Sequence, residues 1–278
     1  MKNIKKYVAE KEKAYDDAVA EAVDAAIKNN KKFILLAGAS SSGKTTTSLR
    51  IDAALESHGK KSETVSLDDF YYDSSVKVIM RDGKPDFETP ESLEIPLIRK
   101  TLADIAEGKP VHFPRFDFGV RKRVENGNFF APDDDTFIVV EGLHALNPDV
   151  VGDLPNAHRI YLQCEDDRYD PKMLRRIIRD MKFRSASAEL TLGMWSDVKR
   201  GEKLYIRPYV SLSDSVVNTY LGYELGAFKK EGLAMVDTVS KGTPHYDELL
   251  VIKELLEQTD EVARCVIPKR SLLREFIG

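Results

Sequence analysis

The clearest element in the hydrophobic pattern is a continuously apolar run, F-I-L-L-A, at residues 33–37. An exposed strand alternates apolar and polar residues, whereas a parallel strand that is covered on both faces is apolar throughout. Shorter strand-like segments follow, and they alternate with segments of helical periodicity. The strand-like segments are 63–67, 111–113, 137–140 and 159–162, and the helical ones are 45–57, 91–107 and 172–183. This alternation predicts an α/β fold with a parallel sheet flanked by helices.

Both ends of the chain have a helical pattern. Apolar residues recur at helical spacing from Ile4 to Ile27, which predicts an amphipathic helix packed on the core. Residues 187–258 also have a mostly helical pattern. We therefore expect an N-terminal helix at 1–30, a main domain at 31–245 with a helical lid at about 172–205, and a C-terminal helical extension of that domain at 246–278.

Composition and charge limit the partners of the protein. The 278 residues include 42 basic and 46 acidic side chains, so the net charge of -4 provides no global positive field for a nucleic-acid backbone. The two cysteines, Cys164 and Cys265, have no zinc-site or disulfide-framework spacing. No apolar run approaches the roughly 20 residues that a bilayer requires. We expect a cytoplasmic protein that acts on a small molecule, without nucleic acid or membrane.

A phosphate-binding loop follows the first strand. Residues 38–45 read G-A-S-S-S-G-K-T, which matches G-x-x-x-x-G-K-[ST] between a strand and a helix. In this motif backbone N–H groups surround phosphate oxygens, Lys44 bridges the terminal phosphates, and Thr45 offers its hydroxyl to magnesium. ATP and Mg²⁺ are therefore the expected cofactors, and the fold class is of the P-loop NTPase type. The expected nucleotide-binding residues are Gly38, Ala39, Ser40, Ser41, Ser42, Gly43, Lys44, Thr45 and Thr46.

A GTPase switch also carries such a loop, but it needs a guanine-reading N-K-x-D, which this sequence lacks. Residues 149–152 match D-x-x-G, but they follow Asn147-Pro148 rather than a strand, so we expect a loop there. The sequence therefore favours a kinase over a switch.

Carboxylates stand at the end of the second predicted strand, in S-L-D-D-F-Y-Y at residues 66–72. The carboxyl end of a strand is where α/β folds bind ligands. A kinase that phosphorylates a hydroxyl needs a carboxylate near the γ-phosphate to take or orient the hydroxyl proton. Asp68 is the candidate for this role, and Asp69 is the weaker one. Considered alone, the segment could equally contain an aspartate that caps a turn.

Several motifs together resemble the uridine kinase and phosphoribulokinase family, whose uridine–cytidine kinases carry a similar D-S-F-Y segment. They follow the family order and extend over residues 33 to about 184: D-F-E-T-P at 86–90, P-R-F-D-F at 114–118, E-G-L at 141–143, and R-R-I-I-R-D at 175–180 followed by Arg184. Beyond residue 185, segments such as R-P-Y at 207–209 and L-R-E-F-I-G at 273–278 resemble a bacterial branch of uridine kinase-like nucleoside kinases.

The resemblance implies a role for each matched residue. Asp68 corresponds to the base for the ribose 5′-hydroxyl, Tyr71 packs beside the nucleoside, and Glu88 takes the place of the aspartate that binds the ribose 2′- and 3′-hydroxyls. Glu141, Thr45 and Asp68 are the implied magnesium-site residues. Arg179 and Arg184, with Lys44, are implied to act on the phosphates as catalytic residues. Arg176 matches an arginine of the family that lies on the acceptor side. Arg175 is expected to lie on a solvated helix face and to pair with acids.

The implied base pocket departs from the family pattern. Phe116 replaces a tyrosine, Arg121 replaces a histidine that contacts the pyrimidine, and Met194 or Trp195 lies near the position of a lid glutamine. Since a pocket selects strongly through polar atoms that would otherwise be unpaired, these replacements bear on the choice of acceptor.

The leading hypothesis is an ATP- and Mg²⁺-dependent kinase that phosphorylates the 5′-hydroxyl of a nucleoside, uridine or cytidine. One alternative is a kinase of the same fold that acts on a sugar phosphate such as ribulose 5-phosphate, which Arg121 would suit, or on pantothenate. Another alternative is a nucleotide-dependent regulatory protein. The five histidines show no ligand spacing and are expected to be structural or surface residues. A homo-oligomer is compatible with the sequence but is not indicated by it.

Overall fold

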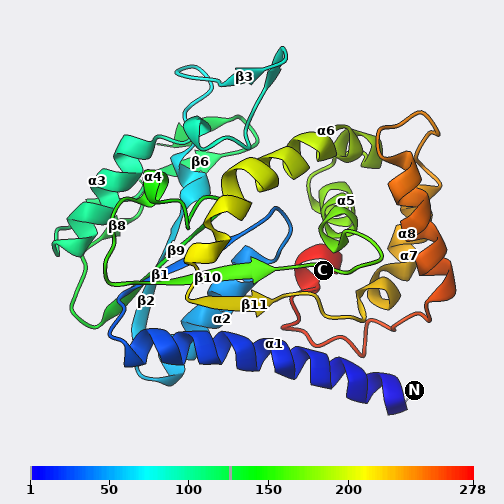
Figure 1. The fold of residues 1–278 in the computed structure, drawn as a ribbon, viewed down its shortest axis with the longest axis horizontal. Helices are drawn as coiled ribbons and strands as arrows, with labels where there is room; N and C mark the ends of the chain where they lie inside the picture. Colours follow the sequence, from blue (N-terminus) through cyan, green and yellow to red (C-terminus); the bar gives the residue numbers. More distant parts are fainter. Residues whose placement is uncertain (1, 125–126) are drawn as a thin grey trace.

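A five-stranded parallel sheet forms the centre of the computed structural model, which describes residues 2–124 and 127–278 (Figure 1). Residue 1 of the expected N-terminal segment lies outside this description. The strand order is β11-β10-β1-β9-β2, and every neighbouring pair is parallel. The strands are β1 (Phe33–Gly38), β2 (Lys61–Ser66), β9 (Thr136–Gly142), β10 (Ala157–Gln163) and β11 (Ser215–Asn218).

Helices cover both faces of this sheet, which explains why β1 is apolar at every position. Ile34 and Leu36 belong to the hydrophobic cluster that also contains the buried faces of the N- and C-terminal helices. Leu35 and Ala37 belong to a second cluster on the opposite face, with α3 (Ile95–Ala106) and α4 (Pro148–Val151). The predicted parallel sheet with helices on both sides is confirmed.

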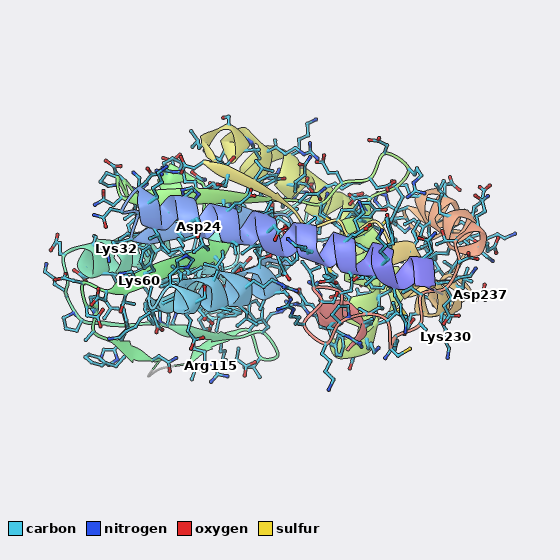
Figure 2. All side chains as sticks on the ribbon, turned by 90° about the horizontal axis from the view of Figure 1, so that it is seen from below. Asp24, Lys32, Lys60, Arg115, Lys230 and Asp237 are labelled. Carbon is cyan, nitrogen blue, oxygen red and sulfur yellow. The ribbon has the colours of Figure 1, made fainter. Side chains whose placement is uncertain are left out.

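The N-terminal helix α1 (Lys2–Lys28) lies along the molecule and packs beside α2 (Lys44–Ser57), as Figures 1 and 2 show from two directions. Val8, Tyr15, Val19 and Val23 form its buried stripe, at the spacing that the sequence pattern predicts.

The second half of the chain supplies α5 (Pro171–Phe183), α6 (Ala188–Gly201), α7 (Glu224–Val236), α8 (Tyr246–Gln258) and the terminal turn of helix α9 (Arg274–Ile277). A π-helical turn at Glu202–Ile206 and a 3₁₀ segment at Arg207–Leu212 connect α6 to β11. The helical reading of residues 187–258 is thus wrong at Ser215–Asn218, which add the edge strand β11 next to β10. Four residues are too few for a period to emerge, and the neighbouring strand determines their conformation.

Residues 111–113 were predicted to form a strand of the central sheet, and this prediction is also wrong. The strand in this segment is the short β5 (Val111–His112), which pairs antiparallel with β8 (Phe129–Phe130) outside the central sheet. Two further ribbons, β3 (Met80–Arg81) with β4 (Lys84–Pro85) and β6 (Arg115–Asp117) with β7 (Lys122–Val124), lie in the same part of the chain. In β5 only Val111 is buried while His112 is exposed, so this segment does not have the two covered faces of a central strand.

No helix among residues 2–124 and 127–278 combines the length and the apolar character that crossing a bilayer would require.

Candidate functional site

The phosphate-binding loop connects β1 to α2. Gly43, the residue before α2, has φ 88° and lies directly against Leu272, so a side chain at this position would be strained and would collide with Leu272. Lys44 Nζ donates to the carbonyl oxygens of Gly38 and Ala39, at 3.1 and 3.2 Å. The lysine is therefore held over the loop, and the first N–H groups of α2 are directed toward the place of an anion.

A cavity of about 340 Å³ begins at this loop. Ser40, Ser41, Gly43, Lys44 and Thr45 line it, whereas Gly38, Ala39, Ser42 and Thr46, which the structure also describes, lie outside its lining. Asp68, Glu141, Tyr71, Glu88, Phe116, Arg121, Arg176, Arg179 and Arg184 line the same cavity. All of the predicted acceptor, base, metal and lid residues are thus brought together.

Two carboxylates face the loop because β2 and β9 end side by side. Ser66 pairs with Glu141 in the parallel register, and the Ser66 hydroxyl donates to the Glu141 carboxylate. A 3₁₀ turn at Leu67–Phe70 then carries Asp68 into the cavity. Burial, and after it the negative charge of Asp68, raises the pKa of Glu141. A cation between these carboxylates would relieve that repulsion.

Asp69 points elsewhere: its carboxylate accepts the backbone N–H of Phe116 at 2.9 Å. Burial raises the pKa of Asp69. This contact gives Asp69 a structural task in holding β6, in keeping with its weaker candidacy as a base.

The oxygen donors near the loop suit magnesium, which prefers oxygen ligands and usually keeps substrate phosphates and water in its shell. Thr45, Asp68 and Glu141 offer one hydroxyl and two carboxylates. Within the described ranges, no group of three or more His, Cys, Asp or Glu side chains could hold a metal by itself. A magnesium ion at this site would therefore need phosphate oxygens, as magnesium does in nucleotide-dependent transferases.

Aromatic rings form the far end of the cavity. The Tyr71 ring lies 5.7 Å from Phe116 and 6.0 Å from Phe118, centroid to centroid, and its hydroxyl donates to the Phe87 carbonyl at 2.8 Å. Burial raises the pKa of Tyr71 well above its ordinary value. Arg121, in the left-handed region at φ 53°, places its guanidinium 5.1 Å from the Phe87 ring centroid.

Glu88 lies between the aromatic end and the loop. The backbone N–H of Glu88 donates to Asp86 at 3.1 Å, and Asp86 is itself paired with Arg81 and Arg200. Burial raises the pKa of Glu88, while Arg176 and Lys44 act in the opposite direction. Gly201 at the end of α6 approaches so closely that a Cβ there would lie 2.5 Å from the Glu88 Cβ. Helix α6 (Ala188–Gly201) is thereby packed closely against Glu88.

Helix α5 carries two of the arginines predicted for the lid, Arg176 and Arg179, and Arg184 follows at its C-terminal end. Arg176 Nη1 donates to the Ser40 hydroxyl at 2.6 Å, which ties this helix to the loop. Asp180 pairs with Arg179 at 2.8 Å and with Arg176 and Arg184, each at 3.6 Å. One buried acid therefore gathers three guanidinium groups whose residues all line the cavity.

The expectation for Arg175 is wrong in one respect: it pairs with an acid but is not solvated. Arg175 and Glu224 are both 0% exposed, and Arg175 Nε donates to Glu224 at 2.8 Å. Arg175 also donates to the backbone carbonyls of Thr219 and Ser41, at 2.7 and 3.2 Å. The cause is the packing of α5 between the loop and α7, which no local pattern reveals.

Sequence reasoning missed four lining residues, Phe87, Phe118, Leu143 and Glu275. The first three belong to the motifs at 86–90, 114–118 and 141–143, so their position beside predicted site residues could have indicated them. Glu275 comes from the C-terminal end, and nothing local connects it to the loop. Trp195 is only 1% exposed and belongs to the core rather than the cavity. His144 is buried too, which lowers its pKa to about 4.

Comparison with known proteins finds a matching family model and a similar uridine kinase. The family model described as "Phosphoribulokinase / Uridine kinase family" matches residues 33–221. A uridine kinase from Staphylococcus epidermidis is 30% identical over 191 residues, which cover 68% of this chain and 88% of that protein.

Two solved structures show the shared fold. A D-glycerate 3-kinase from Cryptococcus neoformans has TM-score 0.53 and 14% identity, covering 74% of this chain and 96% of its own. A protein described as a fructose transport system kinase from a Silicibacter species has TM-score 0.52 and 17% identity, covering 69% of this chain and 92% of its own. The predicted P-loop type of α/β fold is confirmed.

Proposed function

Because the chain belongs to the phosphoribulokinase and uridine kinase family, we propose that it is an ATP- and Mg²⁺-dependent kinase that phosphorylates the 5′-hydroxyl of a nucleoside, uridine or cytidine. Membership in this family makes the chain a phosphotransferase. The nucleoside acceptor and the metal are the proposal.

The observation that carries the proposal is one cavity that is lined both by the phosphate-binding loop and by the residues proposed to bind the acceptor. Lys44 and Thr45 of the loop, the aromatic residues Tyr71 and Phe116, and Asp68 all line it. A phosphoryl group that moves along this cavity needs no covalent intermediate on the protein. Direct in-line transfer is therefore the expected course.

In this reaction Asp68 accepts the proton of the attacking hydroxyl, or orients that hydroxyl, as the γ-phosphoryl group leaves ADP. Lys44, Arg179 and Arg184 spread the negative charge that develops on the transferring group. Magnesium held by Thr45, Glu141 and Asp68 would supply charge neutralisation between the β- and γ-phosphates.

The acceptor pocket fits a ribonucleoside. The raised pKa of the Glu88 carboxyl reflects its desolvated position, where a carboxylate binds two ribose hydroxyls more strongly than in water. Tyr71 and Phe116 offer ring faces beside a base. The positive charge of Arg176 favours the ionised form of Glu88, and so it opposes the effect of burial on the pKa of that carboxyl. Glu88 can therefore act as a carboxylate that accepts hydrogen bonds.

Replacement of Asp68 by Asn tests the catalytic assignment. ATP affinity should stay within about twofold because the loop is unaltered, whereas kcat should fall by a factor on the order of 10² or more. Asp69→Asn, next to it, serves as the control for the removal of one negative charge. Equal turnover in wild type and Asp68→Asn would remove Asp68 from the catalytic role.

An anionic acceptor is the second candidate, and one observation favours it. Arg121, Arg176, Arg179 and Arg184 all line the cavity, so a sugar phosphate would meet several cations. Pantothenate, with its carboxylate, is also an acceptor of this kind. A regulatory protein that only binds the nucleotide would not require a carboxylate such as Asp68 in the same cavity as the phosphate-binding loop.

The remaining sequence expectations stay part of this proposal. The unpaired state of Cys164 and Cys265 supports a cytoplasmic location. We propose that residues 1–30 form the N-terminal helical part, residues 31–245 the kinase domain with its lid, and residues 246–278 a helical extension of that domain.

A further inference from the structure

A second hollow, of about 640 Å³, adjoins the donor loop on the outer side of α2. We call it the terminal groove, because α1 forms one wall and residues 269–275 near the C-terminus form another, with α2 as the floor. Figure 2 shows α1 beside α2 and the C-terminal segment next to them. The groove and the cavity at the phosphate-binding loop share Glu275 in their linings, so the two spaces adjoin at this residue.

The junction between the two spaces lies at the start of α2. Thr46 lines the groove, and its hydroxyl donates to the Glu275 carboxylate at 2.7 Å. Thr46 follows directly on Lys44 and Thr45, the residues that serve the terminal phosphates. Because Thr46 and Glu275 lie where the two spaces adjoin, a nucleotide whose phosphates lie at the loop can extend past them into the groove.

The walls of the groove have the chemistry of a nucleoside site. Ala20 of α1 and Ala53 and Ala54 of α2 leave a smooth apolar surface, and Leu49 is 65% exposed beside them. Arg270 also lines the groove and pairs with Asp16 at 3.1 Å, and a guanidinium group of this kind can stack on the face of an aromatic ring. A volume of this size lies within the range of small-molecule sites.

The C-terminal segment is firmly attached, so that it can position Glu275. Leu272 packs against Gly43 of the loop. The Arg274 guanidinium donates to the Ile267 and Arg264 carbonyls, at 2.7 and 2.9 Å. The guanidinium carbon of Arg175 lies 5.4 Å from the Phe276 ring centroid.

We infer that the terminal groove binds the base and ribose of the phosphate donor, a purine ribonucleotide, and that Glu275 accepts hydrogen bonds from its ribose hydroxyls. This inference rests on the proposed function for its donor, ATP. Helix α1 and residues 269–275 lie outside the family match over residues 33–221, so this chain builds the site with its own two ends.

Calorimetric binding of ATP and of inorganic tripolyphosphate, each with magnesium, tests the inference without any acceptor. In Ala53→Trp the new ring fills the groove, so ATP affinity should fall at least tenfold while tripolyphosphate affinity stays within twofold. Glu56→Trp is the matched control, because Glu56 is an exposed residue of the same helix that does not line the groove. ATP affinity should be unchanged in this control.

Glu275→Gln should weaken ATP binding about fivefold and reduce the preference for ATP over 2′-deoxy-ATP. Unchanged ATP affinity in Ala53→Trp, or tighter ATP binding in Glu275→Gln, would overturn the inference. The second result would mean that the carboxylate repels the phosphates instead of binding the ribose. If wild type binds neither probe, the proposed donor itself is wrong and the inference falls with it. A nucleoside that is not phosphorylated while ATP still binds in the groove refutes only the proposed acceptor.

Discussion

Replacement of Arg175 by Met should destabilise the protein strongly, although this residue does not line the catalytic cavity. The side chain is fully buried and pairs with the equally buried Glu224. Without the guanidinium, Glu224 would keep a buried charge with no cation, and the carbonyls of Thr219 and Ser41 would each lose a donor. Loss of one partner of a buried ion pair costs about 3–5 kcal/mol. The folded-to-unfolded ratio should therefore fall by a factor of about 10² to several 10³.

Chemical unfolding followed by the fluorescence of Trp195 measures this loss, because Trp195 is the single tryptophan and is buried. Arg168→Met is the matched control: Arg168 pairs with Asp166, but 54% of its side chain is exposed, so we expect a loss of at most about 1 kcal/mol. The double variant Arg175→Met with Glu224→Leu should be more stable than Arg175→Met alone. A value for Arg175→Met within about 0.5 kcal/mol of wild type would refute the reasoning.

Three further outcomes are expected. Glu141→Gln should raise the magnesium concentration for half-maximal rate by about tenfold, and an unchanged magnesium dependence would exclude Glu141 from the metal site. Glu88→Gln should raise KM for a ribonucleoside and bring it close to that of the 2′-deoxynucleoside; a preference for the ribose that persists would show that another group reads the diol. His144, whose pKa burial lowers to about 4, takes up its proton at a higher pH in the unfolded chain. The free energy of unfolding should therefore fall by about 3 kcal/mol between pH 6.5 and 4 on account of this residue. In His144→Gln this part of the pH dependence should be absent. Chemical unfolding of both proteins at a series of pH values measures the difference.

The residues that could be predicted from the sequence are those that local geometry brings to the site. The loop at 38–45 has its own backbone requirement, met at Gly43 by φ 88°. Asp68 and Glu141 follow neighbouring parallel strands, and such strands end at the same edge of a sheet. The position of each residue at the end of a predicted strand was therefore enough to predict that Asp68 and Glu141 line the same cavity.

The residues that could not be predicted depend on packing between distant segments. Ser215–Asn218 become a strand only because β10 leaves an edge to pair with. Arg175 and Arg176 are adjacent on one helix, yet one is enclosed beside α7 and the other lines the cavity. Glu275 reaches the loop through the fold of the whole C-terminal half. Helical periodicity gives the face of a helix but not the element that will cover it.

The most direct test of the proposed function is a comparison of kcat/KM for uridine, cytidine, ribulose 5-phosphate and pantothenate under saturating ATP and magnesium. The proposed site predicts saturable phosphorylation of uridine or cytidine, with phosphate on the 5′-oxygen of the product. Saturable turnover with the sugar phosphate or pantothenate alone would contradict it.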